Sequence, residues 1–113
     1  ELTMNICERS GYTISVEIKQ DGSIEFLKHR ENKTDDFDRN QVSRPSNRLI
    51  VEKKDVKDFL RVIHAEDKKD HEEMMSAIKE KFNKIKNFKE IKMFFEDMEI
   101  PYQVTNWEAF YES

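Results

Sequence analysis

The chain has 113 residues, of which 39% are charged and 36% hydrophobic, and its formal net charge is −4. Its one cysteine, Cys7, excludes an intrachain disulfide and a multi-cysteine zinc site, and no apolar run approaches the ~20 residues that span a bilayer. We expect one soluble, cytoplasmic domain over residues 1–113, with eight Phe among the side chains available for its core.

The first half, residues 1–52, is predicted to form a sheet. From Tyr12 to Lys19 apolar and polar residues alternate with a period of two, which is typical of a half-buried strand. Three-residue loops that each end in glycine, at residues 9–11 and 20–22, would connect this strand to a neighbour on either side. The resulting register pairs Ile6 with Ile14, Met4 with Val16, Ile18 with Ile24 and Val16 with Phe26.

A fourth strand is expected over residues 48–52. It follows a polar stretch, residues 30–47, that has no hydrophobic periodicity and exceeds the usual length of a connection in a compact domain. We therefore predict that residues 30–47 form a mobile loop.

The predicted register also defines the outer face of the sheet. Glu17 lies opposite Glu25, a like-charge pair that destabilises a sheet unless something compensates. One interpretation is a paired-carboxylate site for a cation, a proton transfer or a basic partner side chain. The other, which we favour, is a solvated face on which Lys19 lies diagonally and relieves the repulsion. The predicted rows are Thr3–Glu17–Glu25, Asn5–Ser15–Leu27 and Cys7–Thr13–His29.

The second half is predicted to form three short helices over residues 55–98. Asp55 is the expected first cap, and capping-box patterns begin at Asp70 and Asn87. The polar stretch between Ile63 and Met74 argues against one continuous helix. The apolar residues at helical spacing are Val56, Phe59, Leu60 and Ile63; Met74, Ile78, Phe82 and Ile85; and Phe88, Ile91, Phe94, Phe95 and Met98, the last three of which we expect to be buried.

Pro101 ends the third helix, and residues 102–104 can add a short closing strand. The capping-box pattern of Thr105 and Glu108 can then start a last helical turn. The predicted fold is α+β, with an antiparallel sheet of about four strands covered on one face by about three helices.

The acidic, aromatic C-terminal segment, residues 99–113, is the clearest sign of a partner. From residue 93 to the end there are five carboxylates, six aromatics and no Lys or Arg, a composition suited to docking against a basic surface. Trp107 is read either as an exposed anchor or as a core residue. The residues predicted to bind a partner are Trp107, Phe110, Tyr111, Glu108 and Glu112, together with Glu17 and Glu25.

Patterns for catalysis or metal binding are incomplete. A ligand set of His64, Asp67 and His71 needs an unbroken helix, which the apolar pattern opposes. The Asp35–Asp38 cluster lacks the glycine and terminal Glu of an EF-hand loop, and two strand spacings separate Cys7 from His29. We therefore predict no enzyme activity, no catalytic residue, no bound metal and no cofactor.

The basic residues around the long loop support an alternative function. Three hairpin-linked strands, a longer connection, and Leu49–Val51 running into a helix form an order similar to the ββββα unit of single-strand-binding transcription coactivators and Pur-type repeats. The resemblance covers residues 3–63 and implies nucleic-acid binding on the outer sheet face. That face departs from the family pattern, because Glu17 and Glu25 stand where stacking aromatics and cations would be expected. The candidate residues in the segment 28–54 are Arg30, Lys33, Arg39, Arg44 and Arg48.

Our leading hypothesis is a non-catalytic protein-binding domain that regulates or inhibits a partner with a basic surface, as an immunity protein, phage inhibitor or adaptor does. Single-stranded nucleic-acid binding is the alternative, and a metal-dependent hydrolase is a distant third.

Overall fold

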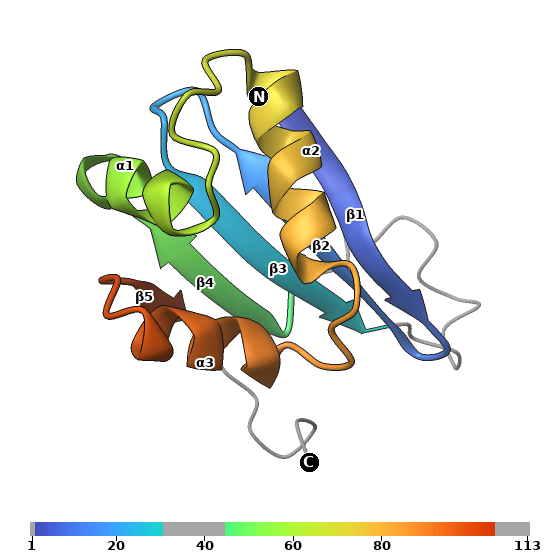
Figure 1. Ribbon diagram of the computed structural model, residues 1–113. Helices are drawn as coiled ribbons and strands as arrows, with labels where there is room; N and C mark the ends of the chain where they lie inside the picture. The colour runs from blue at the N-terminus through green and yellow to red at the C-terminus, as the bar shows by residue number, and fades with distance from the viewer. Residues whose placement is uncertain (1, 31–44, 106–113) are drawn as a thin grey trace.

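The computed structural model describes residues 2–30 and 45–105, which form one antiparallel sheet and three helices (Figure 1). The strands follow one another across the sheet in chain order, from β1 at one edge to β5 at the other. They are β1 (Leu2–Arg9), β2 (Tyr12–Ile18), β3 (Ile24–Arg30), β4 (Asn47–Val51) and β5 (Gln103–Thr105). The predicted α+β fold, including the short closing strand, is confirmed.

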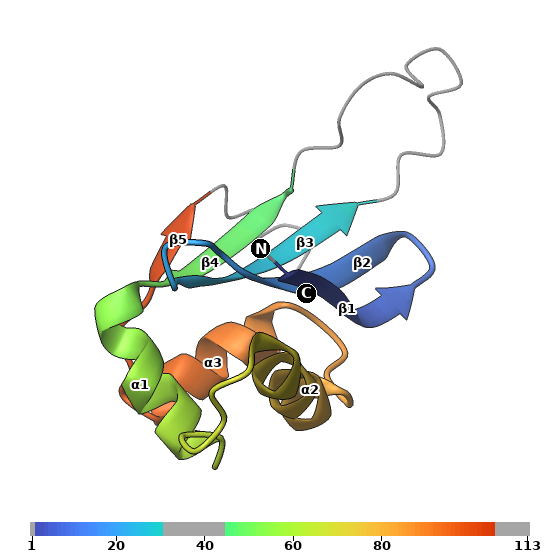
Figure 2. The ribbon, with the colours of Figure 1, turned by 90° about the horizontal axis from the view of Figure 1, so that it is seen from above.

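All three helices pack against the same face of the sheet (Figure 2). They are α1 (Lys53–Val62), α2 (His71–Phe82) and α3 (Lys89–Asp97). The gap between α1 and α2 confirms the predicted break, so His64 and His71 do not share a helix.

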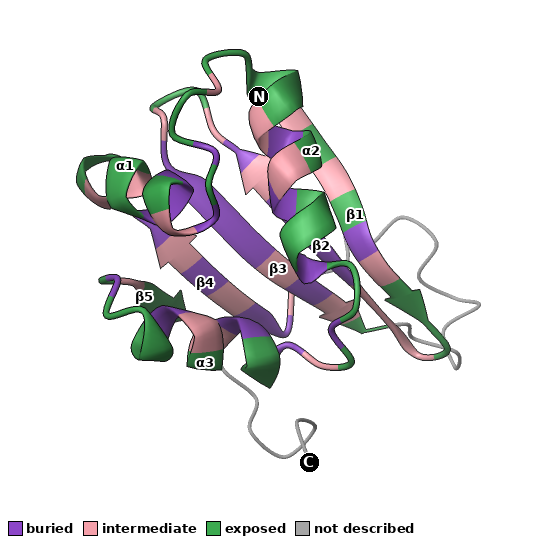
Figure 3. Ribbon diagram, viewed as in Figure 1, coloured by how far each residue is buried: buried purple, intermediate pink, exposed green. Residues whose placement is uncertain are grey.

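The core lies between the sheet and the helices and centres on Phe26 of β3. Its ring meets Phe59 of α1, Phe82 of α2 and Phe95 of α3 at centroid separations of 6.0, 5.4 and 5.8 Å, each edge to face. Such ring pairs add to the free energy of burial. Figure 3 shows that most of β3 is buried, as expected of the strand that all three helices cover.

The second hairpin has the predicted register. Ile18 pairs with Ile24, Val16 with Phe26, and Glu17 lies opposite Glu25. The amide of Gly22 donates to the Lys19 carbonyl at 3.0 Å, and the φ of Gly22 is +94°, in the region that favours glycine. The three-residue loop is therefore confirmed.

The first hairpin differs from the prediction. Arg9 pairs with Tyr12, so the loop has two residues, Ser10 and Gly11, and the shorter loop is compensated by a bulge between Asn5 and Cys7. Beyond the bulge Met4 still pairs with Val16, as predicted.

Between the loop and the bulge the alternation of β1 is reversed. Cys7, rather than Ile6, lies opposite Ile14, and Glu8 lies opposite Thr13. The Cys7 thiol accordingly lies on the helix side, 3.7 Å from the carbonyl oxygen of Ile85. The predicted row Cys7–Thr13–His29 is wrong, and the observed row is Glu8–Thr13–His29.

The fourth strand starts one residue earlier than expected, because the chain before it is already packed. Ser46 and Asn47 are buried, and the Ser46 amide donates to the Lys28 carbonyl at 2.8 Å. The two ends of the predicted mobile loop, residues 30–47, thus belong to the sheet, with Arg30 in β3 and Asn47 in β4. Residues 31–44 lie outside the described part.

Two of the three predicted helix starts are confirmed. The Asp70 carboxylate accepts from the Glu72 amide at 3.3 Å, and Asn87 and Glu90 exchange hydrogen bonds of 3.0 and 3.1 Å in a capping box. The first prediction is wrong: α1 begins after Glu52, and Asp55 lies in its first turn. A carboxylate there still faces the positive end of the helix dipole.

Both α1 and α3 end in a Schellman motif without glycine. The two residues that follow their C-caps, His64 and Glu99, have φ of 60° and 57°. The backbone amides of the next residues, Ala65 and Ile100, donate hydrogen bonds to the carbonyls of Leu60 and Phe95. Ala65 and Ile100 are both buried.

The end of α3 also explains a wrong prediction about burial. We expected Met98 to be buried with Phe94 and Phe95, but Met98 is the C-cap and is 45% exposed. Phe95 is buried, and Phe94 is partly buried against the core. In α2 it is Met75 that is fully buried, whereas Met74 packs at the edge of the core.

Replacing either hairpin glycine by alanine should destabilise the fold by about 1–2 kcal/mol, because φ of +99° at Gly11 and +94° at Gly22 is strained for any residue with a Cβ. Gly22→Ala should cost more than Gly11→Ala, since its Cβ would lie 3.3 Å from the Lys53 side chain while the site at Gly11 is open. Urea unfolding of the two variants checks this order. Wild-type stability in both would refute the assigned loop conformations.

Candidate functional site

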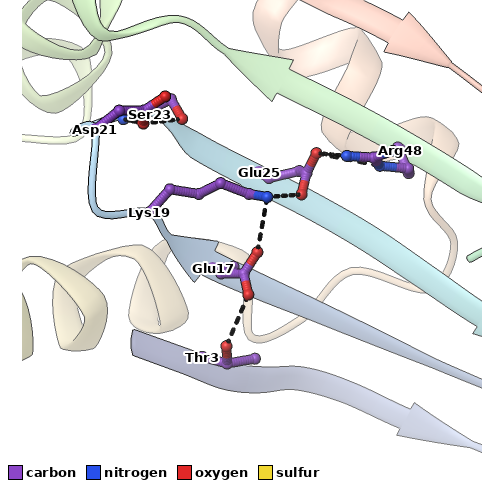
Figure 4. Close-up of polar contacts among 7 residues, drawn as sticks. All are labelled: Thr3, Glu17, Lys19, Asp21, Ser23, Glu25 and Arg48. Carbon is purple, nitrogen blue, oxygen red and sulfur yellow. Dashed lines mark hydrogen bonds and ion pairs between the residues drawn. The ribbon is translucent and has the colours of Figure 1, made fainter. Parts of the chain in front are cut away.

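A chain of charged side chains crosses the outer face of the sheet, on the side away from the helices (Figure 4). The Lys19 ammonium lies 3.4 Å from a Glu17 oxygen and 3.3 Å from a Glu25 oxygen. The other oxygen of Glu25 accepts from the Arg48 guanidinium, through Nε at 3.1 Å and through Nη2. Glu17 also accepts a 3.4 Å hydrogen bond from the Thr3 hydroxyl.

The predicted arrangement of Glu17, Glu25 and Lys19 is confirmed, but the role of Arg48 was missed. Arg48 comes from β4, and its position opposite Leu27 brings it next to Glu25. The β3–β4 register follows a connection without periodicity, so counting along the sequence could not supply this contact. The signal that could have found it was the like-charge pair itself, which needs a second cation.

The β2–β3 loop sets the position of Lys19. Asp21 accepts from the Ser23 amide at 2.8 Å and from the Ser23 hydroxyl at 2.6 Å, which closes the loop. These hydrogen bonds lower the pKa of Asp21. The loop thereby reverses the chain direction, and the Lys19 ammonium lies between the carboxylates of Glu17 and Glu25.

Glu25 is the buried centre of this network. Glu25 is only 2% exposed, although its side chain lies on the face of the sheet that no helix covers. A buried carboxylate is costly unless it is paired, and here two cations pair with it. The hydrogen bond to Glu25, and then its charge, raise the pKa of Lys19.

This pairing limits what Glu17 and Glu25 can do for a partner. A cationic side chain of a partner protein would have to displace Lys19 or Arg48 to reach Glu25. The same contact occupies Arg48, which was one of the candidate nucleic-acid-binding residues. The network therefore has a structural role that the sequence interpretation of a tolerated repulsion did not include.

A second set of exposed residues lies in the segment 93–105, which runs from α3 through β5 and which we call the α3–β5 surface. Met93, Met98 and Val104 are 49%, 45% and 39% exposed, and they are the exposed large hydrophobic residues of the described ranges. All three fall within residues 93–105. This segment holds three exposed carboxylates, Glu96, Asp97 and Glu99, and no Lys or Arg.

Tyr102 connects this surface to the core. Its ring packs 6.0 Å from that of Phe95, and burial, followed by the charge of Glu96 and a hydrogen bond to it, raises the pKa of Tyr102. Tyr102 therefore fixes this segment to the core, while the carboxylates and methionines of the segment are solvent-exposed.

Other predicted site residues are dispersed or lie beyond the described ranges. Cys7 and His29 are on opposite faces, because the bulge turns Cys7 inward. Within residues 2–30 and 45–105, no three His, Cys, Asp or Glu side chains gather to hold a metal ion, and no helix has the length and apolar character to cross a membrane. Two groups of predicted site residues fall outside the described residues. In the long loop they are Lys33, Arg39, Arg44 and Asp35–Asp38, and near the C-terminus they are Trp107, Glu108, Phe110, Tyr111 and Glu112.

The chain matches no protein-family model, and no curated protein or solved structure is significantly similar to it. The resemblance to single-strand-binding coactivators thus stays one of strand order over the ββββα portion, to which this fold adds two helices and a fifth strand.

Replacing Glu25 by Gln should lower the free energy of unfolding by about 1–3 kcal/mol, because it removes the shared partner of Lys19 and Arg48 at a buried position. Glu17→Gln is the matched control and should cost less than about 1 kcal/mol, since Glu17 is more exposed. Unfolding in urea gives both values. An unchanged or raised stability of Glu25→Gln would show that the pairing merely cancels the cost of burying the carboxylate.

The contribution of Lys19 should disappear in the alkaline range. Its pKa in the folded state is raised above the ordinary 10.5, so the stabilisation is fully present below 10.5 and is lost as pH rises through the folded-state pKa. The unfolding midpoints of wild type and Lys19→Gln should therefore differ near neutral pH and converge above 10.5. Titration of Tyr102 affects both proteins equally. A gap that is independent of pH would contradict the assigned ion pairs.

Proposed function

We propose that this protein is a non-catalytic binding protein that regulates or inhibits a partner protein, and that it docks the α3–β5 surface against a basic surface of that partner. The observation that carries the proposal is the coincidence, in residues 93–105, of exposed apolar residues with exposed carboxylates and no Lys or Arg.

The apolar part of this surface suits contact with a protein. Met93 and Met98 are unbranched and polarisable, and methionines of this kind adapt to the shape of a partner. Burying two such side chains and Val104 on association would contribute apolar free energy that a purely charged surface lacks. In the proposed complex these three residues would form the apolar core of the interface, and the carboxylates would lie at its polar rim.

The charges on this surface favour one kind of partner. Glu96, Asp97 and Glu99 are exposed, and the sequence beyond residue 105 adds Glu108 and Glu112 with no cation. A field of one sign speeds association with a surface of the opposite sign and repels phosphates. Trp107, Phe110 and Tyr111 remain the predicted aromatic anchors of the same segment.

We assign Glu17 and Glu25 a secondary part in docking, because Lys19 and Arg48 already neutralise them. The alternative of single-stranded nucleic-acid binding through residues 28–54 has less support, since Arg48 is bound to Glu25 and the outer face places two carboxylates along the path of a polyanion. We place the docking function in the cytoplasm because a chain with one cysteine has no intrachain disulfide to form.

The docking proposal is tested with charge-reversed variants. Asp97→Lys/Glu99→Lys should abolish capture of a partner from a lysate of the source organism, because both carboxylates are exposed on the proposed surface. Asp67→Lys/Glu80→Lys is the matched control, with one exposed carboxylate in the α1–α2 connection and one on α2. The captured protein is then purified, and its association rate with the wild type should fall as salt rises.

Two results would refute the proposal. One is a partner that binds both variants equally well. The other is a purified partner whose association with the wild type does not depend on ionic strength.

A further inference from the structure

The exposed side of α3 carries three residues in a row, with opposite charges at the two ends of the row. Lys89, Met93 and Glu96 follow one another at i, i+4 and i+7, so they share one face of the helix. All three are exposed, and Met93 is 49% exposed. Ile91 and Phe95 are buried, which places the row on the side away from the core. We call Lys89, Met93 and Glu96 the α3 stripe.

α3 lies at the border of the helix layer, with α1 and α2 both on one side of it (Figure 1). Phe94 marks this covered side, since its ring lies 6.5 Å from Phe59 of α1 and 5.2 Å from Phe82 of α2. At 3.6 residues per turn, Lys89 and Glu96 are turned roughly 140–160° away from Phe94. The α3 stripe therefore lies on the open flank of the helix.

The charges of the chain around α3 are segregated by sign. Residues 84–92 hold four lysines and one glutamate, whereas residues 93–105 hold three carboxylates and no Lys or Arg. The change of sign falls at Met93, the middle residue of α3. Such a segment is complementary to an antiparallel copy of itself, because its basic half then faces the acidic half of the copy.

We propose that α3 packs against α3 of a second copy of the chain, antiparallel to it and around a two-fold axis at Met93. The two Met93 side chains meet at the centre, where exposed and adaptable apolar groups are removed from water. Lys89 of each copy lies beside Glu96 of the other, because the two positions are at nearly equal distances on either side of residue 93. The interface is isologous, so each ion pair occurs twice.

Contacts within the chain hold Glu96 in place for this pairing. Glu96 and Tyr102 share a side-chain hydrogen bond, and the Tyr102 ring packs 6.0 Å from that of Phe95. The Tyr102 hydroxyl donates one proton, so the carboxylate keeps acceptor sites for the ammonium of a second copy. A side chain that is held before association loses less conformational freedom when the complex forms.

The like charges of α3, Glu90 and Asp97, are kept off the line of contact. They lie on the flank of Met93 that is nearer to Phe94, while the two charged residues of the α3 stripe lie on the other flank. The carboxylate of Glu90 also accepts hydrogen bonds from two backbone amides just ahead of the helix, at 2.5 and 3.0 Å. The two helices therefore approach most closely along the flank of the ion pairs.

The size of the interface predicts a weak, reversible dimer. α3 has nine residues and is about 13 Å long, so the contact of two such helices falls below the ~1,200 Å² at which stable interfaces begin. We expect a dissociation constant on the order of 10–100 μM. Met93 and Glu96 also belong to the α3–β5 surface, so a second copy and the proposed partner would compete for it; this consequence alone rests on the proposed function.

The test is sedimentation equilibrium of the full chain at concentrations that span the expected dissociation constant. The wild type should pass reversibly from monomer to dimer and no further. Lys89→Glu and Glu96→Lys should each raise the dissociation constant about tenfold or more, because each turns both ion pairs into repulsions. An equimolar mixture of the two variants should dimerise again, since every pair in a mixed dimer joins opposite charges.

The matched controls are Lys79→Glu and Glu80→Lys, which reverse two exposed charges on α2 and should dimerise like the wild type. Circular dichroism spectra of all variants should overlay that of the wild type. This comparison separates lost association from lost folding.

Four results would overturn the proposal. The first is a monomer at every concentration. The second is unchanged dimerisation of Lys89→Glu and Glu96→Lys, which would assign the contact to another surface, such as the edge of β1. The third is a mixture of these folded variants that stays monomeric. The fourth is association beyond the dimer, as expected of a head-to-tail contact. None of these results changes the outcome of partner capture, so the two proposals can fail separately.

Discussion

The structure depends on one ring of the central strand, Phe26, which touches a phenylalanine of every helix. The face that Phe26 occupies is fixed by its pairing with Val16, and this pairing is fixed by the three-residue loop that ends in Gly22. Because side chains alternate along a strand, a slip of one residue would turn Phe26 to the open face and bury Glu25 under the helices. The same loop thus places the aromatic core on one side of β3 and the ion-paired glutamate on the other.

The first hairpin reaches a compatible register by a different route. Its loop is one residue shorter, and the bulge between Asn5 and Cys7 restores the pairing of the remaining strand. Bulges that re-aim side chains are common near functional sites. Here the bulge has a chemical result, because it places Glu8 rather than Cys7 beside Thr13 on the open face. A row that would have carried a thiol therefore carries a carboxylate, and the thiol of Cys7 lies on the helix side instead.

Sequence reasoning succeeded where the determinants were local. Period-two alternation with Gly22 was enough for the β2–β3 register, and the patterns at Asp70 and Asn87 were enough for two helix starts. It failed where the determinant was distant, as with Arg48, which reaches Glu25 across a register that no short loop defines. It also failed at Met98, because helical spacing says nothing about where a helix stops, and α3 stops with a left-handed Glu99 in place of the usual glycine. Both glycines of the chain are used in hairpins, so helix ends carried no glycine signal.

The charges of this acidic chain are sorted by position on the sheet. In the middle, Glu17 and Glu25 are neutralised by Lys19 and Arg48, so they stabilise the fold and present little net field. At the β5 edge, by contrast, residues 93–105 carry three exposed carboxylates and no Lys or Arg. The charges at the centre of the sheet therefore stabilise the fold, whereas those at the β5 edge are the ones on which the proposed docking depends.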